Sequence, residues 1–261
     1  MTEAVSRRTF LAAGPALAVL PLRATAPQAP VADLFPTQPP ELVKEMVAVA
    51  HGNFDRVRQL VEARPALAKA AWDWGFGDWE SAIDAASHVG NRPIAEYLIS
   101  KGARPTLFTA TMMGQLDVVK AAIAATPGIQ RTRGPHGITL LAHARFGGDK
   151  AVEVLRYLES LGDADPAYTP VALSAAEKLA IPGIYVFGAG ANDRFEIAES
   201  KQGSPTILRP GGTSRGLVHV GSLQFHPVGA ESVRIRFDVT DGRATALAVH
   251  DPDLVVTARR G

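Results

Sequence analysis

The sequence predicts an α+β chain of two domains, in which paired helices precede a small antiparallel up-and-down β-barrel of about eight strands. Turn glycines recur between alanine-rich amphipathic stretches as far as residue 165. Beyond residue 182, short runs of alternating polar and apolar residues take over. The predicted boundaries are an export segment at 1–26, a linker at 27–39, the helical repeat at 40–165, a linker with a short helix at 166–181 and the β domain at 182–261.

Composition limits the classes of function. The 261 residues suffice for two cores, and 46% hydrophobic with 20% charged residues is typical of globular proteins. A net charge of +1 does not favour nucleic acid as a partner. The absence of cysteine excludes disulfides and thiolate zinc sites. After the N-terminal segment, no long uninterrupted apolar stretch predicts a membrane span in the mature form.

The N-terminal segment has the features of an export signal. Arg7 and Arg8 precede an apolar run that ends at Leu22, which is too short to cross a bilayer as a helix. Together with Phe10 and Leu11, the two arginines resemble the twin-arginine translocation motif. That resemblance implies a periplasmic or secreted protein, with the signal cleaved after Ala26.

Four glycines organise the helical part. Gly52, Gly90, Gly114 and Gly148 each end an alanine-rich stretch, and apolar residues then recur at helical spacing. Each glycine permits the left-handed turn between two paired helices. Helices are predicted at 41–50, 54–64, 80–89, 92–101, 105–113, 116–126, 139–147 and 150–161.

This part of the chain resembles the ankyrin repeat. The stretch from Ser81 to Asn91 matches the family's Thr-Pro-Leu-His-x-Ala-Ala-x-x-Gly-His pattern, and 137–144 is a second match. Asp84, Phe108 and Ala142 stand where the family has a buried histidine. The resemblance implies an α-solenoid of about four repeats with a concave face that binds a protein partner. Another α-hairpin repeat remains an alternative.

Two long connections are candidate partner-binding segments. The first holds Trp72, Trp74, Phe76 and Trp79, which either form an aromatic contact surface or pack inside the chain against the first repeat or the β domain. The second is basic and either holds an acidic partner or is a solvated loop. Its candidate residues are Arg131, Arg133 and His136.

The β domain is predicted from residue alternation. Val233, Ile235 and Phe237 alternate with polar residues, and Asp241-Gly242 is a strong hairpin signal. Strands are predicted at 183–188, 195–199, 206–209, 215–220, 222–226, 233–239, 243–249 and 254–258. The Gly183-Ile184-Tyr185 start and the later hairpins resemble the lipocalin-like extension of exported bacterial proteins. This resemblance implies an accessory or small-ligand-binding barrel.

The motifs of common enzymes are missing. There is no Gly-x-Ser-x-Gly, and Ser174 is followed three residues later by Glu177 instead of lysine. We therefore predict no catalytic residue and no cofactor. The seven histidines show no metal-ligand spacing on one helix, so no metal site is predicted. His219, His226 and His250 are either isolated imidazoles or, alternatively, zinc or copper ligands on adjacent strands. Asp84 is expected to hydrogen-bond a neighbouring turn.

Taken together, the sequence predicts an exported, non-catalytic adaptor that holds a protein partner on the concave face of its repeats. One alternative is a carrier that binds a small apolar ligand in the β-barrel. The other is a hydrolase with its site between the two domains.

Overall fold

The computed structural model describes residues 36–261, of which Gln38–Gly261 form one compact unit. The predicted signal peptide at 1–26 lies outside the described residues, as do its motif residues Arg7, Arg8, Phe10 and Leu11. Most of the predicted linker at 27–39 also lies outside them. Among residues 36–261, no helix has both the length and the apolar character needed to cross a membrane.

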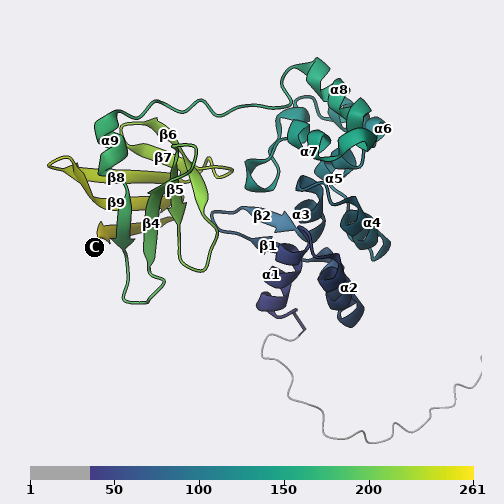
Figure 1. Cartoon of the computed structure of the whole chain (residues 1–261), viewed down its shortest axis with the longest axis horizontal. Helices are drawn as coiled ribbons and strands as arrows, with labels where there is room; N and C mark the ends of the chain where they lie inside the picture. The colour runs from purple at the N-terminus through teal and green to yellow at the C-terminus, as the bar shows by residue number, and fades with distance from the viewer. Residues whose placement is uncertain (1–35) are drawn as a thin grey trace, which may run out of the picture. The chain divides into compact units, whose positions relative to one another are not determined.

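Helical pairs follow one another along the first part of the described chain (Figure 1). The first helix of each pair contacts the first helix of the next pair. Each predicted helix is present, with ends within two residues of those expected. The pairs are α1 (Pro40–Val49) with α2 (Phe54–Ala63), α3 (Ala82–His88) with α4 (Arg92–Ser100), α5 (Leu107–Met112) with α6 (Leu116–Ala125), and α7 (Leu140–Phe146) with α8 (Val152–Leu161).

Short polar side chains fix where three of the first helices begin. Ser81, Thr106 and Thr139 are the N-caps of α3, α5 and α7, and each side-chain oxygen accepts a backbone N–H from three residues ahead. Such caps satisfy N–H groups that have no partner inside the helix. Asp84 accepts hydrogen bonds from the hydroxyls of Ser81 and Thr106, both at 2.6 Å. The prediction that Asp84 bonds a neighbouring turn is therefore confirmed.

The turn glycines Gly90 and Gly114 are required for two reasons. Their φ angles are +73° and +74°, a region that glycine enters without steric cost. A Cβ would also lie 2.2 Å from the carbonyl oxygen of Phe146 at Gly90, and 1.9 Å from that of Lys150 at Gly114. Both contacts join segments far apart in sequence, so these glycines permit close packing between helical pairs.

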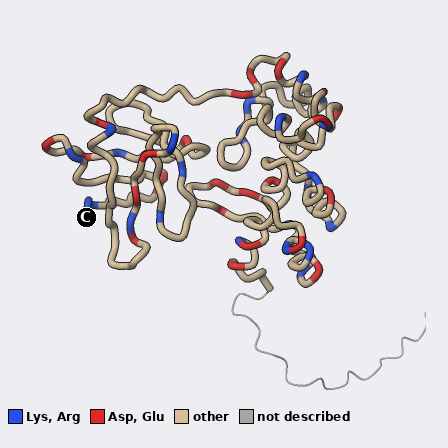
Figure 2. Tube along the Cα trace, in the orientation of Figure 1, with Lys and Arg blue, Asp and Glu red and all other residues tan. Residues whose placement is uncertain are grey.

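A strand pair stands between α2 and α3, where the sequence indicated only a long connection. A short 3-10 helix, η1 (Pro65–Lys69), leads into β1 (Ala71–Asp73), which pairs antiparallel with β2 (Trp79–Ser81). Figure 2 shows acidic positions along this hairpin, which carries Asp73, Asp78 and Glu80. The hairpin brings carboxylates and tryptophans to one place in the fold.

A closed antiparallel barrel follows the short helix α9 (Ala175–Ala180). Each strand pairs with the next one in sequence, and β10 closes the ring on β3. This confirms the predicted eight-stranded up-and-down barrel, again with ends within two residues of those expected. Its strands are β3 (Gly183–Val186), β4 (Arg194–Glu199), β5 (Pro205–Leu208), β6 (Arg215–Gly221), β7 (Gln224–Pro227), β8 (Arg234–Thr240), β9 (Arg243–Asp251) and β10 (Leu254–Arg260).

Both parts have apolar cores, built from different side chains. Alanines such as Ala82, Ala85 and Ala95 are fully buried among the helices and allow close helix packing. The barrel core is aromatic and branched, with Tyr185, Phe225 and other large side chains completely enclosed. Side chains therefore fill this part of the barrel interior.

Candidate metal centre

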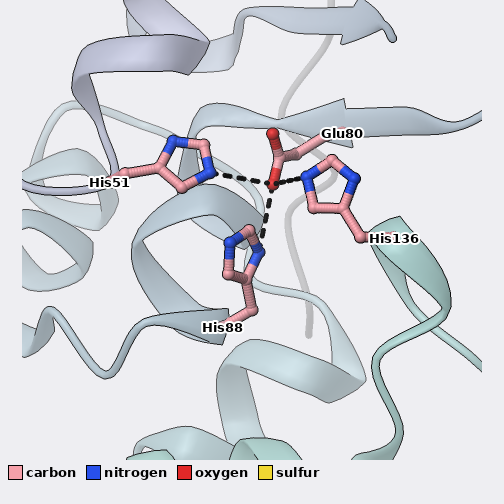
Figure 3. Close-up of side chains that lie close together, drawn as sticks. All are labelled: His51, Glu80, His88 and His136. Carbon is pink, nitrogen blue, oxygen red and sulfur yellow. Dashed lines mark ion pairs between the residues drawn. The ribbon is translucent and has the colours of Figure 1, made fainter. Parts of the chain in front are cut away.

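Three histidines and one glutamate converge from four separate segments of the chain (Figure 3). His51 follows α1, Glu80 lies in β2, His88 is the last residue of α3 and His136 lies in a 3-10 turn, η3 (Pro135–Gly137). Each side chain offers one ligand atom, and these four atoms all lie within 4.8 Å of one another. This is a compact N₃O donor set.

The distances around Glu80 match those of a coordination shell. Glu80 Oε1 lies 3.6 Å from His51 Nε2, 3.1 Å from His88 Nδ1 and 3.3 Å from His136 Nε2. Bonds of about 2.0–2.2 Å to a tetrahedral Zn²⁺ place neighbouring ligand atoms about 3.4 Å apart. The three carboxylate–imidazole distances are therefore already close to those of a metal site.

Glu80 is held as a buried anion with one oxygen directed at the histidines. The residue is 0% exposed, and Trp74 Nε1 donates a 2.7 Å hydrogen bond to Oε2. Burial alone raises the pKa of this carboxyl, but the contacts with His136 and His88 outweigh that effect and lower the pKa to about 2. A buried carboxylate requires compensating positive charge, which protonated imidazoles or a metal cation supply.

Asp78 fixes the orientation of His136. Its Oδ1 accepts the backbone N–H of His136 at 2.8 Å, and its Oδ2 accepts Nδ1 at 2.7 Å. Nε2 therefore faces Glu80. In many metal sites a carboxylate orients the ligating imidazole in this way. The hydrogen bond to Asp78, helped by that to Glu80, raises the pKa of His136 to about 9.

His51 is positioned by a backbone contact, and its ring also contacts that of His88. His51 Nδ1 donates to the carbonyl of Ala48 at 3.0 Å, which leaves Nε2 for the centre. His88 is buried, and its Nδ1 has no hydrogen-bond partner among the described residues other than the ion pair with Glu80. The His51 and His88 rings meet edge to face, with centroids 4.8 Å apart. Four groups that bind cations thus face one small volume.

The predicted aromatic segment has divided roles. Trp72 lies in β1, opposite Glu80 in β2, and is partly buried together with Trp74 and Phe76. Trp74 contacts the candidate metal centre through its hydrogen bond to Glu80. Trp79 is 65% exposed. Only Trp79 among the tryptophans therefore presents most of its surface to solvent.

The basic segment makes contacts within the chain. Arg131 forms an exposed ion pair with Asp163 at 3.1 Å. Arg133 donates to the carbonyls of Gly137 and Pro166 and stacks over the Tyr168 ring, with its guanidinium carbon 3.9 Å from the ring centroid. His136, expected in a partner-binding loop, is one of the four potential ligands in the cluster at Glu80.

The alternative histidine set does not come together. His219 Nδ1 donates to the carbonyl of Val171, and His226 Nδ1 contacts the carbonyl of Pro227. Within residues 36–261, the cluster at Glu80 is the only group of at least three potential ligands close enough to hold one ion, and it does not include His219, His226 or His250.

Sequence reasoning missed His51, Glu80 and His88 because it looked for ligands spaced along one helix or placed on adjacent strands. A usable signal was present. His51 and His88 stand one and two residues before the turn glycines Gly52 and Gly90, at the ends of the first helices of adjacent pairs. Packed helices lie 8–10 Å apart, so side chains at such related positions can meet.

The donor set has a defined chemical capacity. Three imidazoles and a carboxylate suit zinc, copper, nickel or iron, and they provide no thiolate for redox chemistry of sulfur. Comparison of the chain with protein-family models and with curated proteins gave no match in either case.

Proposed function

We propose that this protein binds one divalent transition-metal ion, of which Zn²⁺ is the best fit, through His51, Glu80, His88 and His136. The observation that carries the proposal is the convergence of four ligand atoms within 4.8 Å around a carboxylate that is 0% exposed. The orienting contacts from Asp78 and Trp74 support it, because each leaves the correct ligand atom facing the centre.

The proposed role of the ion is structural. Four protein ligands complete a tetrahedral shell, whereas catalytic zinc sites keep a position for water. The ligands come from the turn after α1, from β2, from α3 and from η3, so one ion ties together segments spread over 86 positions between residues 51 and 136. The bound ion would stabilise the folded chain because the unfolded chain does not present these ligands together.

The test starts from the full chain stripped of metal by a chelator and then dialysed. Titration with Zn²⁺ in a calorimeter is expected to give one site per chain. Replacement of Zn²⁺ by Co²⁺ is expected to give the intense visible absorption of a tetrahedral ion. A chain that binds neither ion in this assay would overturn the proposal.

Variants distinguish Zn²⁺ binding at this cluster from adventitious binding elsewhere on the chain. Glu80→Gln keeps the side-chain shape and an oxygen for Trp74 but removes the charge, and His88→Gln removes one imidazole. Both are expected to weaken Zn²⁺ binding by at least tenfold. His226→Gln is the matched control, since His226 is buried but lies outside the cluster. Equal losses in all three variants would argue against this site.

The helical pairs are further proposed to be ankyrin-type repeats and the N-terminal segment to be a twin-arginine signal. The capped starts of α3, α5 and α7 and the left-handed turns at Gly90 and Gly114 support the first. Metal loading in the cytoplasm before export would give a reason for transport in the folded state. Cleavage after Ala26 is testable by mass spectrometry of the exported protein.

A second candidate function is the non-catalytic adaptor. The observation in its favour is Trp79, which exposes 65% of its surface on β2. Large exposed aromatic side chains often anchor a partner. Capture of the same partners by the full chain and by Trp79→Ala would count against this role for Trp79.

A further inference from the structure

A cavity of about 490 Å³ lies where the β1–β2 hairpin approaches the barrel. Its walls are mostly apolar and come from both parts of the chain. The hairpin contributes Trp72, Trp74 and Phe76, and the barrel side contributes Phe187, Ile207 and Val256. A volume of this size is typical of small-molecule sites. The cavity is separate from the metal centre, because none of the four ligands lines it.

Basic side chains stand among these apolar walls. Lys44, Arg209 and Arg215 line the cavity, together with the two acidic residues Asp73 and Asp251. Asp73 accepts the backbone N–H of Gly75 at 2.8 Å. The lining residues thus carry three positive and two negative charges, and Arg209 is paired with Asp193 at 3.4 Å outside the lining.

Arg215 is the most unusual of these groups. Its side chain is only 10% exposed, and Nη2 donates a 2.6 Å hydrogen bond to Asp78. Nη1 is buried and has no hydrogen-bond partner among the described residues. An unsatisfied buried donor on a guanidinium is costly, and an anionic group is its natural partner.

Lys44 indicates which sign of ligand charge the cavity accepts. Its Nζ lies 5.9 Å from the ring centroids of both Trp72 and Trp74 and donates to the carbonyl of Gly211 at 3.2 Å. The aromatic faces that would attract a ligand cation are therefore already occupied by the ammonium group of Lys44. A second cation would also meet the two arginines, whereas an anion would gain free donors on Lys44 and Arg215.

We propose that this cavity binds a small amphipathic anion, namely an organic acid with an aromatic or branched apolar body. The body would lie among Phe76, Phe187 and Val256, and the acid group would bind Arg215 and Lys44. The site does not depend on the proposed metal function, although it adjoins the metal centre. Trp74 contacts Glu80 and Arg215 contacts Asp78, so ligand and ion share neighbouring residues.

Two fluorescent probes test the proposal on the full chain in the presence of a chelator. The probe 8-anilinonaphthalene-1-sulfonate carries an acid group, and N-phenyl-1-naphthylamine has the same apolar body without it. The anionic probe is expected to bind at least tenfold more tightly and to quench tryptophan emission by energy transfer. Equal affinity for the two probes would overturn the anionic assignment.

Variants locate the bound probe. Val256→Trp fills the cavity and is expected to weaken binding of the anionic probe at least tenfold. Lys44→Met and Arg215→Gln are expected to weaken the anionic probe about fivefold or more while leaving the neutral probe unchanged. Lys101→Met is the matched control, because Lys101 lies over the Tyr97 ring at 5.4 Å and does not line the cavity.

The outcomes are distinguishable from those of the metal proposal. Near-UV circular dichroism verifies that each variant is folded, and Lys44→Met tests the charge even if Arg215→Gln does not fold. Unchanged anionic-probe binding in Val256→Trp would place the probe elsewhere and refute the site. Each probe measurement is repeated with Zn²⁺ in place of the chelator, so an effect of metal removal on the cavity is separated from failure of the anion site, and failure of Zn²⁺ binding leaves the result in chelator intact.

Discussion

Replacement of His143 by leucine is expected to make the protein more resistant to mild acid. His143 is 0% exposed in α7, where Nδ1 donates to the carbonyl of Thr139 at 2.8 Å and Nε2 has no hydrogen-bond partner within residues 36–261. Burial lowers the pKa of this imidazole from 6.5 to about 4. The unfolded chain therefore takes up a proton in a pH range where the folded chain does not.

The sign and size of this effect on stability follow from the linkage between proton binding and folding. A depressed histidine pKa means that stability is present above pH 6.5 and is lost as pH falls towards 4. The full effect of His143 is at most about 3.4 kcal/mol, at about 1.4 kcal/mol for each pH unit between the two pKa values. Between pH 8 and pH 5, the expected loss is about 2 kcal/mol.

Urea unfolding at pH 8 and pH 5, with a chelator present, measures this loss. Between pH 8 and pH 5, the free energy of unfolding of wild type is expected to fall by about 2 kcal/mol more than that of His143→Leu. At pH 8 the free energy of unfolding of the variant should be close to that of wild type. The backbone N–H of residue 143 still donates to the carbonyl of Thr139, at 3.1 Å. The raised pKa of His136 acts in the opposite direction but is common to both proteins. Equal acid sensitivity would refute the reasoning.

Three further predictions concern the proposed metal centre and the turns. Asp78→Asn is expected to lower Zn²⁺ affinity about 10- to 100-fold in competition with a chromogenic chelator, and unchanged affinity would contradict the orienting role of Asp78. Zn²⁺ at a hundred times its Kd is expected to raise the free energy of unfolding by about 2.7 kcal/mol in wild type and far less in Glu80→Gln, as measured by urea titration. Gly114→Ala is expected to lower the free energy of unfolding more than Gly148→Ala does, as measured by urea titration. Gly148 is the control because it also has positive φ, but a Cβ there would meet open space. Equal losses in the two variants would mean that packing against Lys150 is unimportant.

Secondary structure was largely predictable because its signals are local. Turn glycines and the period of apolar residues placed α1 to α8 within two residues of their observed ends. The Asp241-Gly242 turn and the alternation beginning at Val233 likewise placed β8 and β9 within two residues of their observed ends. Closure of the barrel was also expected from the number of strands and the tight turns between them.

The β1–β2 hairpin and the cluster of four potential metal ligands were not predicted. Strands of three residues are too short for alternation to be visible, and Gly75 and Gly77 between them resemble an ordinary loop. The ligands at His51 and His136 are 85 positions apart in sequence, so only the packing of the helical pairs brings them together. Local patterns carry no information about such an approach.

The way in which the barrel closes has a practical consequence. Strand β10 pairs with β3 at two positions, Arg259 with Val186 and Arg260 with Tyr185, and Gly261 N–H donates to the carbonyl of Ile184 at 3.1 Å, whereas the pairing of β10 with β9 extends over six positions. Shortening the chain before Arg259 would leave two neighbouring strands with unpaired backbone groups, and such free edges recruit other chains into intermolecular sheets. Proteolytic trimming at this end is therefore a route to aggregation, and affinity tags joined there need a spacer that leaves both arginines in place.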